Sequence, residues 1–182
     1  CFQYLCNKVN YVVRKSLENA VQMEYKALTD DMTGAYNKNR LIELLNNRER
    51  DGQDIAVIYW DVNQLKYVND NWGHLCGDRL ITEVAKTIQS IAREEDIVIR
   101  YGGDEFLLYV ANGTKEIAEQ LIKTWKVRLE EEKKRENYEF PVSASVGYAL
   151  GKHSQLKDII AAADKDMYAN KRICRESYQS KR

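Results

Sequence analysis

The chain has 182 residues, a length that suits one domain with a short extension and excludes a second full domain. Apolar residues make up 44% of it and charged residues 31%, so the composition predicts a folded globular protein with a packed core. The 28 basic and 28 acidic residues cancel, which excludes the overall positive field of a general nucleic-acid binder. Any anion site must therefore be local.

Membrane and export signals are missing from the sequence. The longest strongly apolar stretch, Ile55 to Trp60, is far shorter than the roughly 20 residues that cross a bilayer, and no signal peptide is visible. The four cysteines form no CxxC pair, which argues against a zinc site or a disulfide scaffold and indicates a reducing, cytoplasmic setting. Because the chain begins with Cys1 rather than Met, we expect a fragment of a longer protein, which leaves open the cytoplasmic part of a membrane-bound sensor.

The first predicted element is an amphipathic helix from Phe2 to Leu28, where Gly and Pro are absent and apolar residues recur at helical spacing. Its first part fits the a/d seam of a coiled coil and then drifts out of register. The residues of this seam are Phe2, Leu5, Val9 and Val12. A short coiled-coil arm and a helix packed on its own domain are both compatible with the pattern.

The globular domain, residues 29–182, is predicted to begin at the turn formers between Thr29 and Gly34, which leaves 1–28 as a linker helix. The periodicities then predict a helix at 39–50, a strand at 54–60, helices at 64–71 and 78–93, strands at 97–101 and 104–110, a helix at 115–134, a strand at 140–150 and a helix at 156–173. Gly102 and Gly103 suit the positive φ of a tight primed turn. The order βααββαβα predicts an α+β fold in which helices flank a central, mostly antiparallel sheet.

Three carboxylates stand at predicted strand ends. Asp61 follows the strand that ends at Trp60, and Asp104 and Glu105 follow the two glycines of the hairpin. A hairpin tip that lies next to the end of the first strand would bring the three carboxylates within reach of one metal ion. Carboxylates that close repel one another unless a cation joins them. Hard oxygen ligands suit Mg²⁺ shared with substrate phosphates. The pattern therefore predicts metal-dependent phosphoryl transfer. Two other interpretations stay open: Asp61 as a cap of the next helix, and an acidic hairpin that serves only solubility.

Five blocks of the sequence resemble the motifs of one family, in the same order and spacing. They are Asp30-Asp31-Met32-Thr33-Gly34 with Asn37, Asp61-Val62-Asn63-Gln64-Leu65-Lys66, Asn69-Asp70 with Gly73-His74 and Gly77-Asp78, Gly102-Gly103-Asp104-Glu105-Phe106, and Tyr168-Ala169-Asn170-Lys171. They resemble the GGDEF domains of bacterial diguanylate cyclases, from Asp30 to about Arg175. The resemblance implies a nucleotide-cyclase, palm-like version of the predicted fold and the condensation of two GTP molecules into cyclic di-GMP and two pyrophosphates.

The resemblance also implies a metal site. Asp61, the carbonyl of Val62, Asp104 and Glu105 would hold two Mg²⁺ or Mn²⁺ ions on the GTP phosphates. Glu105 would also be the candidate base that takes the proton of the attacking 3′-hydroxyl. The three carboxylates are the same ones that the strand ends bring together, so the two arguments agree.

Nucleotide recognition is assigned by the same resemblance. Asn69 and Asp78 would bind guanine, because an amide and a carboxylate can pair with its donor and acceptor edges. Lys66, Lys171 and Arg175 would bind the phosphates, and the last two lie four residues apart on one helix face. Seen alone, Asn69 and Asp78 could be helix caps, and the basic cluster could be a solvated helix end.

A further block, Arg93-Glu94-Glu95-Asp96, lies shortly before Gly102 and resembles the RxxD inhibitory site at which this family binds its product. Arg93 would pair with guanine and phosphate, and Asp96 with a guanine N–H edge. The alternative is an ordinary exposed Arg–Asp pair that contributes little to stability.

The implied reaction requires a two-fold homodimer, because one domain binds one GTP and each 3′-hydroxyl must attack the α-phosphate of the other nucleotide. The helix from Phe2 to Leu28 would set this pairing, joined upstream to a sensor domain. Two alternatives remain: a degenerate domain that acts as a receptor for cyclic di-GMP or GTP, and a dimerisation module with a relic nucleotide site. The complete acidic and guanine-binding set favours the enzyme.

Overall fold

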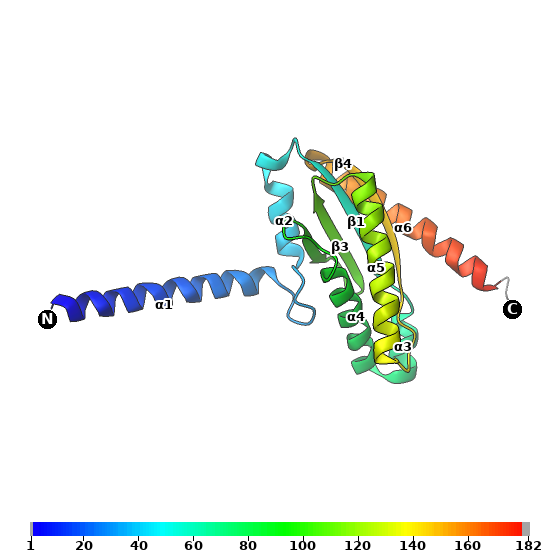
Figure 1. The fold of residues 1–182 in the computed structure, drawn as a ribbon, viewed down its shortest axis with the longest axis horizontal. Helices are drawn as coiled ribbons and strands as arrows, with labels where there is room; N and C mark the ends of the chain where they lie inside the picture. Colours follow the sequence, from blue (N-terminus) through cyan, green and yellow to red (C-terminus); the bar gives the residue numbers. More distant parts are fainter. Residues whose placement is uncertain (1, 180–182) are drawn as a thin grey trace.

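Figure 1 presents the computed structural model of the chain, which describes the backbone of residues 2–179 and the side chains of Lys8 and residues 11–172. A four-stranded antiparallel sheet forms its centre, with the strand order β2-β3-β1-β4. The strands are β1 (Asp54–Val62), β2 (Ile97–Arg100), β3 (Glu105–Ala111) and β4 (Ala144–Lys152). The predicted α+β class with a central antiparallel sheet is confirmed.

Helices cover both faces of the sheet, and each face has its own apolar core. One face carries α3 (Leu65–Trp72), α4 (His74–Gln89) and α5 (Lys115–Glu136). The other face carries α2 (Lys38–Asn46) and α6 (Leu156–Gln179). Short 3₁₀ turns, η1 (Arg48–Arg50) and η2 (His153–Gln155), precede β1 and α6. Strands β1, β2 and β3 are therefore largely buried, and Asp61 and Glu105 emerge at one end of the sheet.

The central strand β1 supplies side chains to both cores. Trp60 is buried against Trp125 of α5, with ring centroids 5.7 Å apart, while Tyr59 belongs to the core under α2 and α6. Because successive residues of a strand point to opposite faces, Asp61 emerges on the same face as Tyr59. Burial of both faces explains the nearly continuous apolar run that precedes Asp61.

Helix α6 closes the outer edge of β4. A carboxylate oxygen of Asp166 accepts a hydrogen bond from the N–H of Tyr148, and the amide of Asn170 donates to the carbonyl of Val146, both at 3.0 Å. Gly147 lies between these two bonds, and a Cβ there would lie 2.0 Å from the backbone nitrogen of Met167 in α6. Only glycine allows the helix to lie this close to the strand, which fixes the part of α6 that enters the site.

The hairpin glycines do not adopt the predicted conformation. Among the glycines in the described part of the chain, positive φ values occur at Gly34 and Gly73, and not at Gly102 or Gly103. The loop instead closes on the carbonyl of Glu105, which accepts hydrogen bonds from the N–H groups of Tyr101 (2.8 Å) and Gly102 (3.2 Å). The prediction of a two-residue primed turn is therefore wrong.

Several element boundaries also differ from the prediction; α2, for example, ends at Asn46 rather than at residue 50, and α4 ends at Gln89 rather than at residue 93. Helix α4 begins at His74 rather than at residue 78, because Gly73, with a φ of 85°, both ends α3 and starts α4. Strand β4 begins at Ala144 rather than at residue 140. Phe140 and Val142 are buried in the core but lie in an irregular segment, so their apolar character mimicked a strand.

Helix α1 (Phe2–Leu28) extends away from the sheet and its covering helices (Figure 1). Residues 11–27 are all exposed, and Val13, Leu17 and Val21 are 51%, 62% and 66% accessible. The predicted helix is confirmed, whereas its packing on its own domain is wrong for this part. Most of the predicted seam, at Phe2, Leu5 and Val9, lies outside the described side chains. Within the described residues, every helix is too short or too polar to cross a membrane.

Candidate active site

Asp61 and Glu105 face each other at one end of the sheet. The antiparallel register of β1 and β3 sets Asp61 directly opposite Glu105. Beyond this pair, the N–H of Val62 donates to the carbonyl of Asp104 at 2.9 Å. Directly opposed residues point to the same face, so the two carboxylates lie side by side on the face covered by α6. The backbones of the four residues to which the resemblance assigned metal binding thus lie next to one another at this end of the sheet.

Lys171 reaches this pair from α6. Its ammonium group forms an ion pair with Asp61, and the two side chains are 18% and 20% exposed. Helix α3 is preceded by Gln64, whose φ is 61°, and no side chain caps it. The interpretation of Asp61 as a helix cap is therefore wrong, because its carboxylate contacts a cation on another helix.

Tyr59 belongs to the site but was missed by the sequence analysis. Its hydroxyl donates a hydrogen bond of 2.7 Å to Oε1 of Glu105. Burial, together with the nearby carboxylate of Glu105, raises the pKa of Tyr59 above its ordinary value. The available signal was strand alternation, which puts residue 59 on the same face as Asp61; in the sequence, Tyr59 looked like one more residue of an apolar strand.

The donor set fits a hard divalent cation in its chemistry. Asp61, Asp104 and Glu105 offer carboxylate oxygens, the ligands that Mg²⁺ prefers. The ammonium group of Lys171 already contacts Asp61, so this end of the sheet accepts positive charge. Within the described residues, no three carboxylate, cysteine or histidine groups converge on one point. Convergence on one cation would therefore require at least some of these side chains to turn.

Asn69 and Asp78 lie on neighbouring helices, α3 and α4. The side chain of Asn69 lies directly on Gly77, where a Cβ would come within 1.9 Å of its amide oxygen. Asp78 follows Gly77 and is exposed inside α4, so it does not cap that helix as one interpretation proposed. Asn69 lies inside α3 and likewise is not a cap. The close helix contact at Gly77 brings the two predicted guanine-binding residues near each other.

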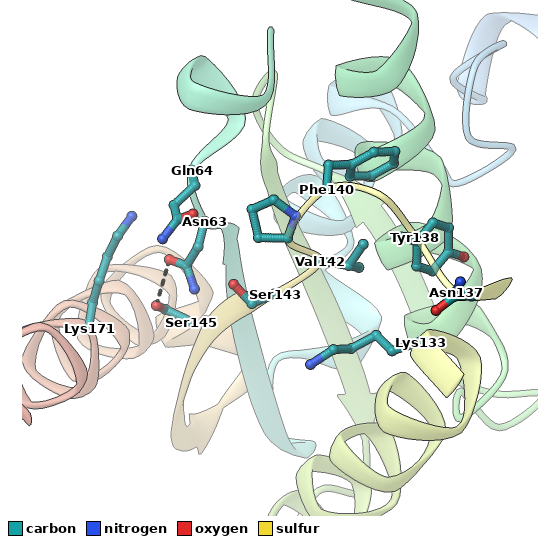
Figure 2. Close-up of a pocket in the computed structure, with 11 residues that line it drawn as sticks. Asn63, Gln64, Lys133, Asn137, Tyr138, Phe140, Val142, Ser143, Ser145 and Lys171 are labelled. Atoms are coloured by element: carbon teal, nitrogen blue, oxygen red, sulfur yellow. Dashed lines mark hydrogen bonds between the residues drawn. The ribbon is translucent and has the colours of Figure 1, made fainter. Parts of the chain in front are cut away.

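A cavity of about 510 Å³ opens beside Lys171 (Figure 2). Asn63 and Gln64 line it from the β1–α3 loop, and Lys133 lines it from α5. Ser145 donates a hydrogen bond of 3.0 Å to Oδ1 of Asn63. Two lysines and no carboxylate are among the lining residues, so the cavity favours an anion next to Asp61.

Of the other two predicted phosphate-binding residues, Lys66 has a described side chain and Arg175 does not. Lys66 lies in the first turn of α3 and is exposed, so its ammonium group is free to move towards a ligand. Arg175 lies in the last part of α6, and its side chain is outside the described residues. Of the basic residues that the sequence singled out, Lys171 is thus the one that the structure places against the carboxylates.

Arg93 and Asp96 form an ion pair in which Asp96 is buried and Arg93 is partly exposed. The side chain of Asp96 is 0% exposed, and its oxygens accept from the Arg93 guanidinium (2.7 and 2.9 Å), the Arg93 N–H (3.0 Å) and the Ala111 N–H (3.2 Å). The hydrogen bond to Asp96 raises the pKa of Arg93. The interpretation as an ordinary exposed pair is therefore wrong. Asp96 would have to give up internal donors before it could accept a hydrogen bond from guanine.

The sequence model of one family, described as "Diguanylate cyclase, GGDEF domain", matches residues 27–177. The chain belongs to the GGDEF domain family. It is 33% identical over 167 residues to the probable diguanylate cyclase DgcJ of Escherichia coli K12, and 34% identical over 149 residues to the cyclic di-GMP phosphodiesterase PdeR of the same strain. These matches cover 85% and 80% of the chain but 33% and 22% of the two relatives. The chain thus spans a third or less of their length.

The fold of this GGDEF domain is similar to that of a solved relative. The coiled coil and GGDEF domain of DgcB from Caulobacter crescentus, solved in complex with c-di-GMP, superimposes with a TM-score of 0.76 at 25% identity. The match covers 94% of each chain. The predicted palm-like GGDEF fold, preceded by an N-terminal helix, is therefore confirmed.

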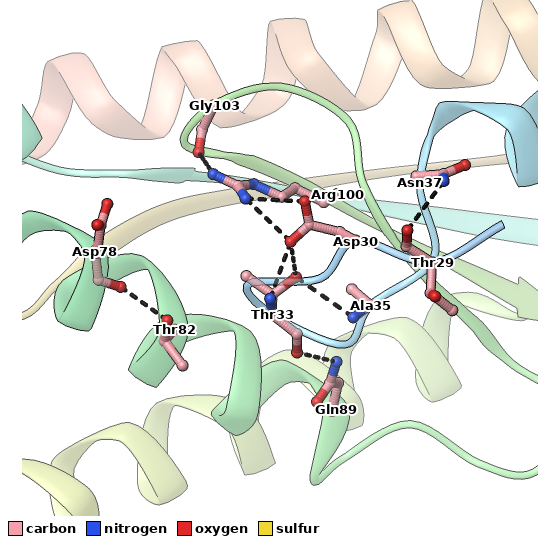
Figure 3. A network of polar contacts seen from close by, with 10 residues as sticks. All are labelled: Thr29, Asp30, Thr33, Ala35, Asn37, Asp78, Thr82, Gln89, Arg100 and Gly103. Carbon is pink, nitrogen blue, oxygen red and sulfur yellow. Dashed lines mark hydrogen bonds and ion pairs between the residues drawn. The ribbon is translucent and has the colours of Figure 1, made fainter. Parts of the chain in front are cut away.

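A second polar network of the GGDEF domain joins the end of α1 to the β2–β3 hairpin (Figure 3). One oxygen of Asp30 accepts hydrogen bonds from the N–H (2.9 Å) and hydroxyl (2.7 Å) of Thr33, and both oxygens contact Arg100. Gly34, with a φ of 70°, closes this turn. In the sequence, Asp30 belongs to the turn formers that mark the domain boundary. Its pairing with Arg100 could not be predicted, because nothing along the chain links two residues that are 70 positions apart.

Proposed function

We propose that this GGDEF domain is a diguanylate cyclase that acts in the cytoplasm and condenses two GTP molecules into cyclic di-GMP and two pyrophosphates. The observation that carries the proposal is the register that sets Asp61 opposite Glu105, with the ammonium of Lys171 on the same face. Family membership alone does not decide the reaction, because relatives named as cyclases and as phosphodiesterases both match the chain.

Each half of the reaction is a phosphoryl transfer. The 3′-oxygen of one GTP attacks the α-phosphorus of the other, the bond from that phosphorus to the bridging oxygen breaks, and pyrophosphate leaves. Glu105 takes the proton of the 3′-hydroxyl. Asp61, Asp104, Glu105 and the carbonyl of Val62 would hold two Mg²⁺ or Mn²⁺ ions, which supply charge neutralisation on the phosphates when bound.

Nucleotide binding is divided between two parts of the fold. Asn69 and Asp78 take guanine between α3 and α4, where Asp78 accepts from the ring N–H and amino groups that adenine lacks. A site whose polar groups would go unpaired rejects the wrong base strongly. Lys171 and Lys66 take the phosphates, with Arg175 further along α6.

Two copies of the domain are needed, because one site holds one GTP and each 3′-hydroxyl reacts in the other site. The exposed apolar side chains Val13, Leu17 and Val21 of α1 recur every four residues and offer a helix-pairing surface. The relative DgcB was solved with a coiled coil before its GGDEF domain, which supports the same role for α1. A sensor domain upstream of α1 would control the pairing.

Product inhibition at Arg93 and Asp96 is part of the proposal, with a condition set by the structure. Because Asp96 is buried and its oxygens are occupied, cyclic di-GMP would first contact the Arg93 side chain, which is 32% exposed. Asp96 then joins only if the Arg93–Asp96 pair rearranges.

The test is to incubate the chain with GTP and Mg²⁺ at low and high protein concentration and to separate the nucleotides with mass detection. We expect cyclic di-GMP that rises more than linearly with protein, and no product from Asp104→Asn. ATP should give no cyclic product. No product at any concentration, together with tight binding of cyclic di-GMP, would contradict the cyclase and support the receptor.

A further inference from the structure

The two facing carboxylates of the site are held by different donors. Asp61 takes the ammonium group of Lys171, whereas Glu105 accepts its hydrogen bond from the phenol of Tyr59 at 2.7 Å. Like charges directly opposite each other destabilise an antiparallel pair, so both carboxylates need a donor. The ammonium group of Lys171 brings a positive charge to Asp61. The phenol of Tyr59 brings no charge to Glu105, so this carboxylate can still attract a cation.

We propose that Tyr59 is a positioning residue that holds the Glu105 carboxylate in the conformation that binds the divalent cation. This inference rests on the proposed function, since it concerns the same metal site. The hydroxyl of Tyr59 contacts Glu105, so its effect is exerted through that carboxylate.

The packing of Tyr59 fixes the position of its hydroxyl. The residue is 2% exposed, and its ring packs edge-on against Tyr101, with centroids 5.9 Å apart and an interplanar angle of 70°. Tyr59 is opposite Leu107 in the register, so Glu105 is its diagonal neighbour on the same face. A buried hydroxyl is costly without a partner, which favours this one hydrogen bond.

Gly102 limits the carboxylate from the other side. A Cβ at this position would lie 2.2 Å from Oε2 of Glu105, so any side chain here would push the carboxylate out of its present position. Oε1 is bound by Tyr59 and Oε2 lies over Gly102. The conformation of Glu105 is therefore set before a ligand arrives, and binding does not pay the entropy of ordering this side chain.

The charges around the phenol keep it a donor. Glu105 and Asp164 of α6 both disfavour the phenolate, and burial acts in the same direction, so the pKa of Tyr59 is raised. Asp61 and Lys171 form the neighbouring ion pair, and Lys38 lies over the ring of Tyr101, which packs against Tyr59. Without the hydroxyl, the Glu105 carboxylate would lose the hydrogen bond that fixes its direction. Partners that orient a metal ligand are worth about 10–100-fold in metal affinity.

The experiment compares Tyr59→Phe with Tyr109→Phe in the full chain. Tyr109 is a matched control, because it is 2% exposed on the same face of the sheet and its hydroxyl bonds Nδ1 of His153 at 3.0 Å, away from the carboxylates. Mn²⁺ binding is measured by calorimetry in the presence of a GTP analogue in which a methylene group replaces the α,β-bridging oxygen, so that no pyrophosphate can leave. Thermal unfolding and the kcat and KM for GTP are measured alongside.

We expect Tyr59→Phe to weaken Mn²⁺ binding about 10–100-fold while the KM for GTP at saturating metal stays within about twofold. Tyr109→Phe should lower the unfolding temperature without changing Mn²⁺ binding. A Tyr59→Phe protein that binds Mn²⁺ as the wild type does, or an equal loss in Tyr109→Phe, would overturn the proposal.

The same measurements distinguish a failure of the proposed cyclase activity from a failure of the proposed role of Tyr59. A wild-type chain that binds Mn²⁺ with the analogue but makes no cyclic di-GMP contradicts the cyclase, and the two variants then still decide the role of Tyr59 by binding alone. A wild-type chain that binds no Mn²⁺ contradicts both proposals.

Discussion

One guanidinium nitrogen of Arg100 contacts both carboxylate oxygens of Asp30 at 3.0 Å, while the other donates to the carbonyl of Gly103 at 2.7 Å. Asp30 lies in the turn that follows α1, and Gly103 lies in the hairpin loop that precedes Glu105. The side chains of Arg100 and Asp30 are 16% and 24% exposed, so the pair is only weakly screened. A single arginine thus ties the end of α1 to the loop that carries Asp104 and precedes Glu105.

The first prediction concerns Asp30→Asn and pH. Although burial opposes it, the hydrogen bonds from Thr33 and Arg100 hold the pKa of Asp30 below its ordinary value. A lowered folded-state pKa contributes stability that is complete above the unfolded value near 4 and is lost as the pH falls through the folded value. We expect Asp30→Asn to cost about 1–3 kcal/mol in the free energy of unfolding at pH 7. The difference from the wild type should shrink below about pH 4.

Urea unfolding from pH 7 to pH 2.5 measures this difference. Asp31→Asn is the control, because Asp31 is the exposed neighbour of Asp30 in the same turn. A loss of stability in Asp30→Asn that is constant down to the lowest pH would contradict the ion pair with Arg100 as its cause.

The second prediction tests the helix contact at Gly77. In Gly77→Ala the new methyl group would collide with the amide of Asn69, which must move. We expect the KM for GTP to rise about 10–100-fold, as for the loss of a hydrogen bond in a binding site, with Mn²⁺ binding unchanged. Gly52→Ala, where a Cβ meets no atom within 4 Å, should leave the KM as it is. An unchanged KM in Gly77→Ala would argue against Asn69 as a guanine ligand.

The elements with strong periodicity could be predicted from the sequence, because local patterns define them. The helix Phe2–Leu28 and the strand beginning at Asp54 are examples. The spacing of Asp61 from Glu105 predicted that strand ends would meet, but the register that puts them directly opposite each other depends on β1–β3 pairing. Local patterns carry no information on such long-range pairing.

Other features could not be predicted for physical reasons. Tyr59 reads as a core residue, and only the fold shows that its hydroxyl reaches Glu105. The space that Gly102 leaves is occupied by a side chain three residues away. The burial of Asp96 depends on an N–H of β3, 15 residues further along the chain. Each of these depends on where side chains lie in space, which the local sequence pattern does not give.

The third prediction concerns Lys171→Met. Removing the ammonium group of Lys171 leaves Asp61 without its ion-pair partner. We therefore expect weaker GTP binding and tighter binding of a metal ion. The KM for GTP should rise about 10–100-fold, because a charged hydrogen-bond donor to phosphate is lost. Mn²⁺ binding to the nucleotide-free chain should become tighter, because the competing ammonium is gone. Lys165→Met, an exposed change on the same helix, is the control.

Calorimetric titration of Mn²⁺ without nucleotide separates the two effects. Weaker Mn²⁺ binding in Lys171→Met would show that the lysine supports the metal site rather than competes with a cation for Asp61.

The last prediction separates a structural role of Arg93 from product binding. Arg93→Ala leaves the buried carboxylate of Asp96 without its guanidinium partner, and breaking such a pair costs on the order of 3 kcal/mol. The same variant should weaken the binding of cyclic di-GMP, because the exposed part of Arg93 is the first contact for the product. Arg128→Ala removes a well-exposed arginine from an α5 surface pair, so its unfolding temperature should stay close to that of the wild type.

Differential scanning calorimetry with and without cyclic di-GMP resolves the two roles of Arg93. We expect Arg93→Ala to melt well below the wild type and to gain less stability from cyclic di-GMP, since a ligand stabilises the folded state in proportion to its affinity. If Arg93→Ala melts lower but gains the same stability from cyclic di-GMP, the arginine only neutralises Asp96. The product then binds elsewhere, and inhibition at this motif is contradicted.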